Sequence, residues 1–572
     1  MISLNRRQVP AYVVAAVVFA LLAMFLLWPI AATLQAGFFV DGEFTVRHIV
    51  NTFQHPLYRA GLINSLMIAV ATTLASILLG VPLALVANRY RFAGKRIWSG
   101  LILVPMILPP FVGAIGLKNL LDLRGSVNML LRSIGVLGSG PNDYIDWLGQ
   151  SGFWGVVIME TLHLYPIMFL NVQAALANVD PSLEEASRNL GAGGWRTFRR
   201  VTLPLARPGL FAGATIVFIW SFTELGTPLM LSYNEVTSVQ IFDFFRVESA
   251  RIHPQAFALV VVLLTFSAAL YLIGRVLLGR GTTAMLTKAT RGAVERSLGA
   301  VGTILATLLF GVTTFLAVLP HIGVVLDSVA GVWTGTVLPT EYTAGHYVNA
   351  MDPEYAALPS IVNSLKYSVA ATGLDVVVGL AIGYLVVRTR IRGRQVLDTL
   401  AMLPLAVPGL VMAAGYIAIT RAGTMLEAIG PWKDPTLLLI IAYAVRRLPY
   451  LVRSVVAGLQ QTSVELEEAA RNLGASPLRT IRKVTLPLIA ANLIAGSLLT
   501  FSFAMLEVSD SLMLAGDQAY YPITKAIYGM MSIADTVGIA TSMGVLGMLL
   551  LTATILAASL LIGRKLGAIF RV

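Results

Sequence analysis

The sequence predicts an all-α protein, a polytopic transmembrane helical bundle of twelve spans. Of its 572 residues, 57% are hydrophobic and only 12% are charged, which lies far outside the composition of soluble domains. Uncharged stretches such as Gln8–Val40 and Ala60–Asn88 recur along the chain. Each of them exceeds the ~20 residues that cross a bilayer as a helix. An ordinary soluble protein is therefore excluded, and the lack of cysteine excludes disulfides and thiolate sites as well.

Eight predicted spans come from stretches without any Asp, Glu, Lys or Arg, and four more are interrupted by a few charges. The uncharged stretches are Gln8–Val40, Ala60–Asn88, Ile97–Leu117, Ile252–Gly274, Ser297–Leu326, Thr399–Thr420, Val484–Leu506 and Thr536–Gly563. The first is too long for the apolar core of a signal peptide, so we expect a retained span there. The twelve spans are expected near residues 11–32, 62–87, 98–117, 152–177, 208–232, 254–274, 299–319, 363–387, 398–420, 436–460, 490–514 and 540–563.

The distribution of basic residues predicts the topology. The net charge is +12, and 27 of the 41 lysines and arginines fall on the side where the chain begins, in alternate loops and both termini. This asymmetry follows the positive-inside rule and places both termini in the cytoplasm. No basic patch with interleaved aromatic residues remains to be explained, so the expected partner is the lipid bilayer and no nucleic acid.

Two internal matches show that the chain contains a repeat. The stretch that begins at Asn64 matches the stretch from Asn363, at an offset of 299 residues. A later stretch from Glu184 matches the stretch from Glu467, at an offset of 283. The difference of 16 residues falls in the outward loop around 118–150 of the first half.

The repeat predicts two halves, residues 1–297 and 298–572, with six transmembrane helices each. Because six is an even number, both halves enter the membrane from the same side. The repeat is then parallel, with a pseudo-two-fold axis along the membrane normal, and a passage is expected at the interface on that axis.

The later pair of matching stretches, 180–205 and 462–488, predicts a helix, a sharp turn and a second helix in the cytoplasm. Asp180 can cap the first helix, with a proline at the first helical position. In the second copy Thr462 and Glu465 have the spacing of a capping box.

Gly191 and Gly474 allow the left-handed conformation that ends each of these helices. A short helix held along the cytosolic face is a shape that docks into a partner's cleft. A solvated loop that merely obeys the positive-inside rule would explain the arginines, but not the repeated E-A-(A/S)-R-N-L-G-A.

These two segments, Glu185–Gly191 and Glu468–Gly474, resemble the EAA loops of binding-protein-dependent ABC importer permeases. Leu-Pro follows twelve and thirteen residues after each glycine, as in that pattern. The fused pair of six-span units is most similar to the permeases of ferric-iron importers and their relatives for phosphonates, thiamine or sugar phosphates. The resemblance implies a bundle of the type I ABC importer permease kind. It implies that the ATPase-coupling residues are Glu185, Ala186, Gly191, Glu468, Ala469 and Gly474.

The same resemblance implies the partners and the location. Each EAA loop would form a coupling helix, so two copies of a cytoplasmic ABC ATPase subunit are expected. A periplasmic or surface-tethered substrate-binding protein would deliver the substrate from outside. The implied location is a bacterial-type cytoplasmic (inner) membrane.

The chain itself is not expected to be an enzyme. It has no G-x-x-x-x-G-K-(S/T) loop to hold phosphates, so ATP hydrolysis is expected in a separate subunit. No constellation of nucleophile, acid–base group and oxyanion donors predicts catalytic residues. Six scattered histidines do not suggest a permanent metal centre, and no cofactor is expected.

Ionisable residues inside the predicted spans mark a candidate substrate pathway, because each costs roughly 2.5–3.5 kcal/mol at bilayer depth. The offset of 283 aligns Glu224 with Glu507 and His163 with Arg446, and Asp510 adds an acid one turn further on. These five residues could form a polar constriction in which the acids bind a cation or the arginine binds an anion. Alternatively, the acids pair with arginines in a purely structural ion network.

Two other buried charges have local interpretations. Glu160 and His163 are three residues apart on one helical face, which favours a hydrogen-bonded pair. Asp375 lies alone in the eighth span, and a partner arginine across the bundle is expected.

The leading functional interpretation is the permease of an ATP-driven importer that works by alternating access. Ferric iron is favoured as substrate by the resemblance and by the paired acids. Phosphonate, sugar phosphate and thiamine-like substrates stay open, because Arg446 and Arg447 fit anionic substrates just as well. A secondary transporter coupled to H⁺ or Na⁺ through the buried acids is the alternative from another class, and it needs no EAA loops.

Overall fold

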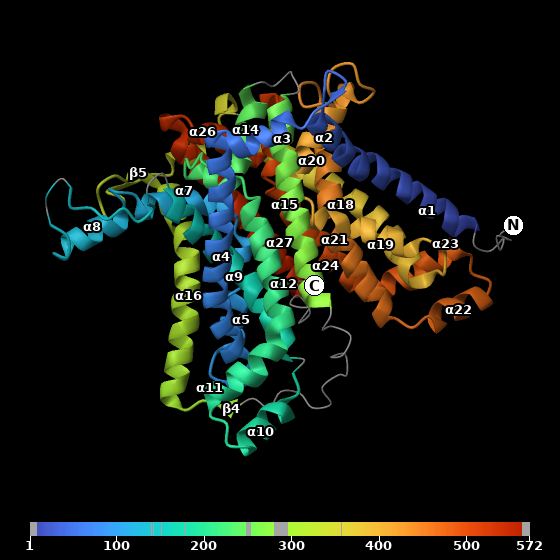
Figure 1. Cartoon of the computed structure of the whole chain (residues 1–572), viewed down its shortest axis with the longest axis horizontal. Helices are drawn as coiled ribbons and strands as arrows, with labels where there is room; N and C mark the ends of the chain where they lie inside the picture. The colour runs from blue at the N-terminus through green and yellow to red at the C-terminus, as the bar shows by residue number, and fades with distance from the viewer. Residues whose placement is uncertain are drawn as a thin grey trace.

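The described chain is built almost entirely of helices that run roughly parallel through a single bundle (Figure 1). The computed structural model describes residues 9–562 except 139, 141, 150–151, 178, 248–252, 280–295 and 356. The predicted cytoplasmic position of both termini falls on residues 1–8 and 563–572, outside the described residues. Strands in the described residues form three two-stranded pairs, β1 with β2 and β5 with β6 antiparallel, and β3 with β4 parallel.

The first half contains most of its residues in five long helices or helix runs, joined by short elements. Its elements are α1 (Val9–Leu22), η2 (Ala23–Leu27), α2 (Trp28–Phe38), β1 (Phe39–Val40), β2 (Glu43–Phe44), α3 (Arg47–Gln54), α4 (Pro56–Arg89), β3 (Tyr90–Arg91), α5 (Lys95–Leu101), α6 (Val104–Ile107), α7 (Pro110–Leu121), α8 (Ser126–Ser133), α9 (Phe153–Ala177), α10 (Pro181–Asn189), α11 (Gly194–Thr197), η4 (Phe198–Thr202), α12 (Leu203–Phe222), α13 (Gly226–Met230), α14 (Thr237–Val247) and α15 (Pro254–Gly279).

The second half repeats this order. After β4 (Arg296–Ser297), which ends the first half, its elements are α16 (Ala300–Asp327), β5 (Ala330–Val332), β6 (Glu341–Tyr342), α17 (Gly345–Asn349), η5 (Pro353–Tyr355), α18 (Ala357–Arg388), α19 (Arg394–Met402), η6 (Leu403–Leu405), α20 (Gly409–Ile419), η7 (Glu427–Ile429), α21 (Thr436–Gln461), α22 (Glu465–Asn472), α23 (Pro477–Thr480), η8 (Ile481–Thr485), α24 (Leu486–Met505), α25 (Ser509–Leu514), η9 (Gln518–Tyr520), α26 (Ile523–Met531), η10 (Ala534–Thr536) and α27 (Val537–Ile562).

The predicted transmembrane bundle is confirmed, although the number of spans depends on how two bent segments are counted. Nine helices in the described residues are long and apolar enough to cross a membrane, and two bent helix pairs raise this number to 11. At the position of the tenth predicted span stands α21, which has 26 residues but carries three arginines. The count of twelve therefore stays a prediction.

The third and ninth spans are not the continuous helices that the sequence analysis expected at 98–117 and 398–420. In the first half the chain bends by 93° between α6 and α7, and in the second by 103° between η6 and α20. Pro109 precedes α7 and Pro408 precedes α20. Proline lacks the N–H that continues a helix and clashes with the preceding turn, so both breaks have the same cause.

The sequence repeat is also a structural repeat, down to single hydrogen bonds. In the first half the backbone N–H of Thr237, at the start of α14, donates to Ser65 Oγ at 3.0 Å. In the second half the N–H of Ile523, at the start of α26, donates to Ser364 Oγ at 2.8 Å. The same helix start is thus fixed to the same long helix in both halves.

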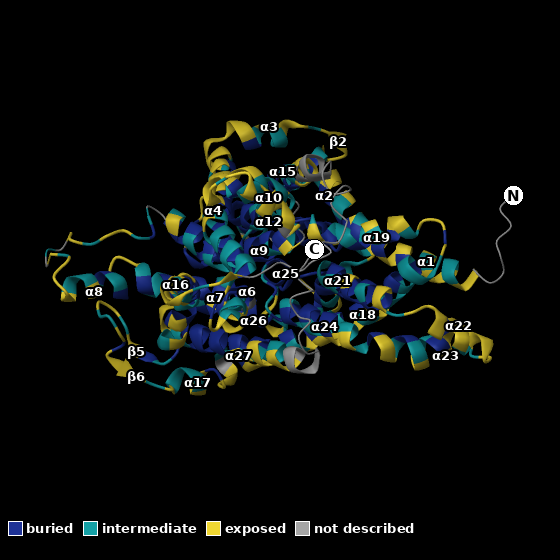
Figure 2. Cartoon of the chain, turned by 90° about the horizontal axis from the view of Figure 1, so that it is seen from below, coloured by how far each residue is buried: buried dark blue, intermediate teal, exposed yellow. Residues whose placement is uncertain are grey.

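The first span of each half packs against the other half. The segment α1–η2–α2 lies along α18, α19 and α20, whereas α16 lies along α5, α6 and α7 (Figures 1 and 2). Tyr416 of α20 donates its hydroxyl to the backbone carbonyl of Phe25 at 2.8 Å. The two halves are therefore joined by an exchange of their first spans, and the boundary at 297/298 stays a prediction about the sequence.

Two glycines at equivalent positions make this exchange possible. Gly116 of α7 lies so close to α16 that a Cβ there would overlap the carbonyl oxygen of Pro320. Gly415 of α20, 299 residues further on, would overlap the carbonyl oxygen of Pro29 in the same way. Small residues that let two backbones approach are the usual means of packing helices in lipid.

Replacing either glycine should therefore loosen the contact between the halves. We expect Gly116→Ala and Gly415→Ala each to destabilise the folded protein by about 1–3 kcal/mol, the cost of overpacking. Thermal unfolding in detergent measures this loss. Gly373→Ala is the matched control, because a Cβ at that position in α18 meets no atom within 4 Å. Equal stability of Gly116→Ala, Gly415→Ala and the control would contradict the packing argument.

Candidate functional site

A cavity of about 220 Å³ lies between the two halves. Elements α7, α9 and α12 line it from the first half, and α20, α21 and α24 line it from the second. Its polar and charged lining residues are Glu160, His163, Ser221, Thr223, Glu224, Thr227, Arg446, Arg447, Tyr450, Ser502, Glu507 and Ser509. Four of the five predicted pathway residues therefore line one cavity, and Asp510, the fifth, lies buried behind Glu507.

Glu224 and Glu507 both lie in breaks between two helices, rather than inside the continuous spans expected at 208–232 and 490–514. Helix α12 ends at Phe222 and α13 begins at Gly226, whereas α24 ends at Met505 and α25 begins at Ser509. A helix that restarts inside the membrane exposes N–H groups that need acceptors. Glu224 supplies one, since its Oε1 accepts from the N–H groups of Gly226 at 3.0 Å and Thr227 at 3.3 Å.

The charges of the second half pair with one another. Arg446 Nη1 lies 3.1 Å from Glu507 Oε1 and 3.8 Å from Asp510 Oδ2. Arg447 pairs with the other carboxylate oxygen of Glu507, and its guanidinium lies 5.4 Å from the centre of the Phe503 ring. Glu507 and Asp510 are at most 2% exposed. The structural ion network that the sequence left open is therefore present in this half.

Gly409 provides the space for Arg446. A Cβ on Gly409, at the first turn of α20, would overlap the guanidinium group. The bend before α20 thus brings the backbone of Gly409, which has no side chain, against the guanidinium of Arg446. This contact fixes the position of Arg446 at the cavity wall.

The first half contributes Glu160 and His163, but the hydrogen bond expected between them is absent. Glu160 Oε2 accepts from Ser221 Oγ and, at 3.5 Å, from Thr72 Oγ1. His163 Nδ1 lies 2.9 Å from the carbonyl oxygen of Pro105. This carbonyl belongs to the segment just before the bend at α7. The prediction from the spacing of three residues was wrong because His163 bonds to that segment instead of to Glu160.

Asp375 also differs from the expectation. It is 1% exposed in α18, and its Oδ2 has no hydrogen-bond partner among the described residues. No arginine in the described part of the chain lies within ion-pair distance, although the charge of Arg447 acts on it from further away. Asp375 does not line the cavity.

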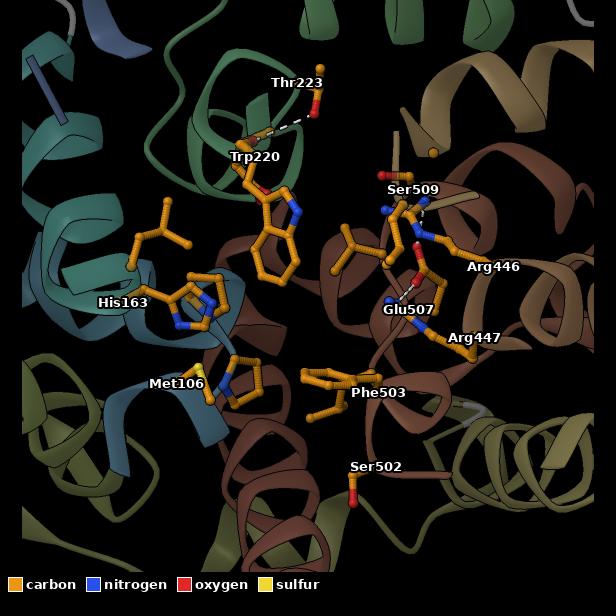
Figure 3. A pocket seen from close by; sticks show the side chains of 18 of the residues that line it. Met106, His163, Trp220, Thr223, Arg446, Arg447, Ser502, Phe503, Glu507 and Ser509 are labelled. Carbon is orange, nitrogen blue, oxygen red and sulfur yellow. Dashed lines mark hydrogen bonds and ion pairs between the residues drawn. The ribbon is translucent and has the colours of Figure 1, made fainter. Parts of the chain in front are cut away.

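Figure 3 shows the two walls of the cavity facing each other. The ion-paired set of Arg446, Arg447 and Glu507 lies on one side, and His163 lies on the other. Trp220 and Phe503 extend into the space between the two walls. Polar groups thus face a cavity in which two aromatic side chains stand between the walls.

The two helices predicted at the EAA motifs are present. Helix α10 begins after Asp180, whose Oδ1 accepts from the N–H of Ser182 at 2.9 Å. It ends before Gly191, which has a φ of 79°, and α22 ends before Gly474, which has a φ of 86°. The capping box expected for Thr462 is wrong: α22 begins after Val464, and Thr462 Oγ1 accepts instead from Arg388 at 2.8 Å.

Each EAA helix is tied to the end of a long span by an ion pair that the sequence analysis missed. Arg89 at the end of α4 pairs with Glu184 of α10. Arg388 at the end of α18 pairs with Glu467 of α22, with Nε 2.9 Å from Oε1. The arginines are 299 residues apart and the glutamates 283, so the two repeat offsets taken together could have found both pairs.

The charge state of Glu184 reflects this tie. Burial alone would raise the pKa of Glu184, but hydrogen bonds from Thr202 and Arg89 and the charges of Arg89 and Arg188 lower it below its ordinary value. Glu184 therefore stays ionised, and this ion pair is held, at every pH at which a free glutamate is ionised.

Beyond these ties much of both EAA segments is exposed, and the ribbon of α22 is largely coloured as exposed in Figure 2. Leu190 is 88% exposed and Leu473 is 89% exposed at the equivalent position. The predicted coupling residues Glu185, Ala186, Gly191, Glu468, Ala469 and Gly474 are exposed on the same two elements. The same fully exposed leucine therefore recurs at the same place in both halves.

A two-fold membrane bundle with a polar cavity on its interface and one such helix per repeat is the architecture of a transport permease. The chain belongs to the family described as binding-protein-dependent transport system inner membrane component, whose profile matches residues 76–283 and 375–567. One match falls in each half, so the predicted family and its repeat are both confirmed.

Relatives with known names are transport permeases. The chain is 31% identical over 497 residues to a ferric transport system permease of Haemophilus influenzae, covering 86% of this chain and 75% of that protein. It is 31% identical over 498 residues to the ferric transport system permease of Actinobacillus pleuropneumoniae, covering 86% of this chain and 69% of that protein. A molybdate/tungstate transport system permease of Thermococcus kodakarensis is 28% identical, over 46% of this chain and 95% of that protein.

Among solved structures, a bacterial ABC transporter involved in the import of the acidic polysaccharide alginate is similar to this chain. The two are 20% identical with a TM-score of 0.40, over 49% of this chain and 98% of that chain.

The ion network predicts an asymmetric response to the loss of buried acids. Glu507→Gln leaves Arg447 without its carboxylate, and breaking a buried pair in this way costs about 3–5 kcal/mol. We expect the lower end of that range, because Asp510 still faces Arg446.

Thermal unfolding of the purified protein measures the effect, with Asp375→Asn as the control. Asp375→Asn removes a buried carboxylate that has no pair, so no loss of stability is expected. If Glu507→Gln and Asp375→Asn lowered the unfolding temperature by the same amount, the loss of stability in Glu507→Gln would not come from the ion network.

Proposed function

We propose that this chain is the membrane subunit of an ATP-driven importer that moves ferric iron from an external binding protein into the cytoplasm. The observation that supports the proposal is the pair of equivalent EAA helices, each exposed, followed by an exposed leucine and tied to a long span. Transport by an ion gradient gives no reason for a repeated docking helix on the cytosolic side.

The ties suggest how ATP hydrolysis would act on the spans. One ATPase subunit would bind α10 and a second would bind α22. Glu184 of α10 contacts both Arg89 of α4 and Thr202 at the start of α12. A displacement of α10 would therefore move two spans that line or support the cavity.

The opposite end of the bundle supports alternating access. There, α14 of the first half meets α26 of the second, and the rings of Phe242 and Tyr528 lie 5.6 Å apart, edge to face. The EAA helices α10 and α22 lie well apart in both views (Figures 1 and 2). This contact between α14 and α26 lies on the side away from α10 and α22, which supports a state open to the cytoplasm.

Iron as substrate is supported by the named relatives and by the cavity. Two relatives that match across both halves are named as ferric permeases. Four acids lie in or directly behind the cavity wall, against two arginines. The relative that matches about half of this chain is named for molybdate and tungstate. Both are anions, and each would have to enter a cavity surrounded by acids.

The test is substrate-stimulated ATP hydrolysis by the chain in lipid with its ATPase subunits. The binding protein would be added in turn with ferric iron, molybdate, a phosphonate, a sugar phosphate and a thiamine-like cation. Stimulation by the ferric form supports the proposal, and stimulation by another form replaces iron by that substrate. If no ATPase subunit associates, a secondary transporter coupled to H⁺ or Na⁺ becomes the better explanation.

The EAA turns should be essential for coupling. The double variant Gly191→Asp with Gly474→Asp places a strained, charged residue in each left-handed turn, so we expect stimulated ATP hydrolysis to be lost. Gly423→Asp is the control, since Gly423 has a φ of 81° and open space around it but lies in a loop on the opposite side. Equal activity of the double variant and the control would remove the basis of the proposal.

The arginine ties should be needed for transport rather than for ATPase docking. In the double variant Arg89→Gln with Arg388→Gln we expect the ATPase subunits still to bind, while the amount of substrate moved per ATP falls several-fold. Uptake and hydrolysis measured on the same proteoliposomes give this ratio. Arg390→Gln, an exposed charge two residues beyond Arg388, should leave it unchanged; an unchanged ratio in the double variant would show that the ties are only structural.

A further inference from the structure

The two walls of the central cavity carry different net charge. On the second-half wall, Arg446 and Arg447 balance Glu507 and Asp510, and each pairs within that wall. On the first-half wall, Glu160 and Glu224 have no arginine or lysine of their own half within ion-pair distance among the described residues. The acids without an ion pair therefore lie on one wall alone, although the charge of Arg446 acts on Glu224 from the opposite wall.

We propose that the first-half wall is the transit site of the transported cation, with the carboxylates of Glu160 and Glu224 as its ligands. This inference rests on the proposed function and adds to it the place and the chemistry of the substrate site. It also assigns the second-half network to a structural role, so Arg446 and Arg447 do not bind the substrate.

Glu160 is the residue that points to a ligand. It is 2% exposed and lines the cavity, and its Oε1 has no hydrogen-bond partner among the described residues. Its Oε2, by contrast, is held by the hydroxyl of Ser221. One oxygen thus fixes the side chain while the other stays available, and a buried carboxylate oxygen without a partner is costly in its charged form unless a cation approaches it.

Glu224 is arranged in the same way. Its Oε1 caps α13 through the N–H groups of Gly226 and Thr227, whereas the residue as a whole lines the cavity beside Ser221 and Thr223. Glu224 lies close enough to Glu160 for its charge to act on it. Carboxylates and hydroxyls are oxygen donors, which prefer hard cations.

The repeat shows that this wall is not simply a copy of the other. At the position of Glu160 the second half has Tyr443, whose hydroxyl lies 2.6 Å from Ser511 Oγ. At the position of Arg447 the first half has Leu164. At the cavity each half thus has two acids, at positions that only partly correspond, but the second half has two arginines there and the first half has none.

The site is suited to passage rather than storage. No group of three His, Cys, Asp or Glu side chains in the described residues has the arrangement of a resident metal site. Two carboxylates on a single wall bind a cation weakly enough to release it, which conduction requires.

Terbium(III) luminescence tests the site directly, because this hard trivalent ion is sensitised by a nearby tryptophan and Trp220 lines the cavity. The chain would be held in lipid with its ATPase subunits and titrated with terbium. We expect Glu160→Gln and Glu224→Gln each to weaken terbium binding by about tenfold or more, the scale seen when groups around a metal are removed. Trp220→Phe should reduce the emission without changing the affinity.

Asp375→Asn is the matched control, a buried carboxylate outside the cavity, and it should bind terbium as the parent does. Wild-type affinity in both Glu160→Gln and Glu224→Gln, or an equal loss in Asp375→Asn, overturns the inference. Hydrolysis stimulated by the ferric-loaded binding protein is measured on the same samples. Without stimulation of the parent the proposed function fails, whereas stimulation together with unchanged terbium binding in the variants rejects the transit site alone.

Discussion

The need to satisfy backbone groups inside the bilayer is the constraint on which the site depends. A continuous helix bonds its own N–H and C=O groups, but a helix that stops and restarts in lipid leaves several of them open. In both halves the fifth predicted span stops inside the bundle, where α12 ends at Phe222 and α24 ends at Met505. A short helix starts a few residues later. Such a break is tolerated only where polar side chains and a cavity replace water, and Glu224 provides this at the start of α13.

The same constraint connects the bends before α7 and α20 to the cavity. A bend exposes carbonyl oxygens, and the carbonyl of Pro105 lies 2.9 Å from His163 Nδ1. On the other side, the bend before α20 brings Gly409 against the guanidinium of Arg446. The prolines that break the helices therefore also place the residues that line the passage. The exchange of first spans then covers α7 and α20 from outside, through the close contacts at Gly116 and Gly415.

Much of this could be predicted from the sequence, because the repeat gave two independent views of each element. The offset of 283 brought Glu224, Glu507, His163 and Arg446 into one hypothesis, and they line one cavity. What could not be predicted depends on neighbours that hydropathy does not specify. Spans apolar on every side pack equally well on several partners, so the exchange of first spans had no signal. The partner of Glu160 is Ser221, 61 residues away, and no local spacing pointed to it.

Fusion of the two repeats in one chain explains why their walls could become different. Two identical subunits around an axis must carry the same charges, so any acid added to one wall is added to both, and any arginine as well. In a fused chain each position varies alone. The second half could then keep a balanced network in which Glu507 is held between Arg446 and Arg447, while the first half kept unpaired acids. A passage with one rigid neutral wall and one acidic wall can hold a cation at the interface without binding it from both sides, so that a small movement between the halves is enough to release it.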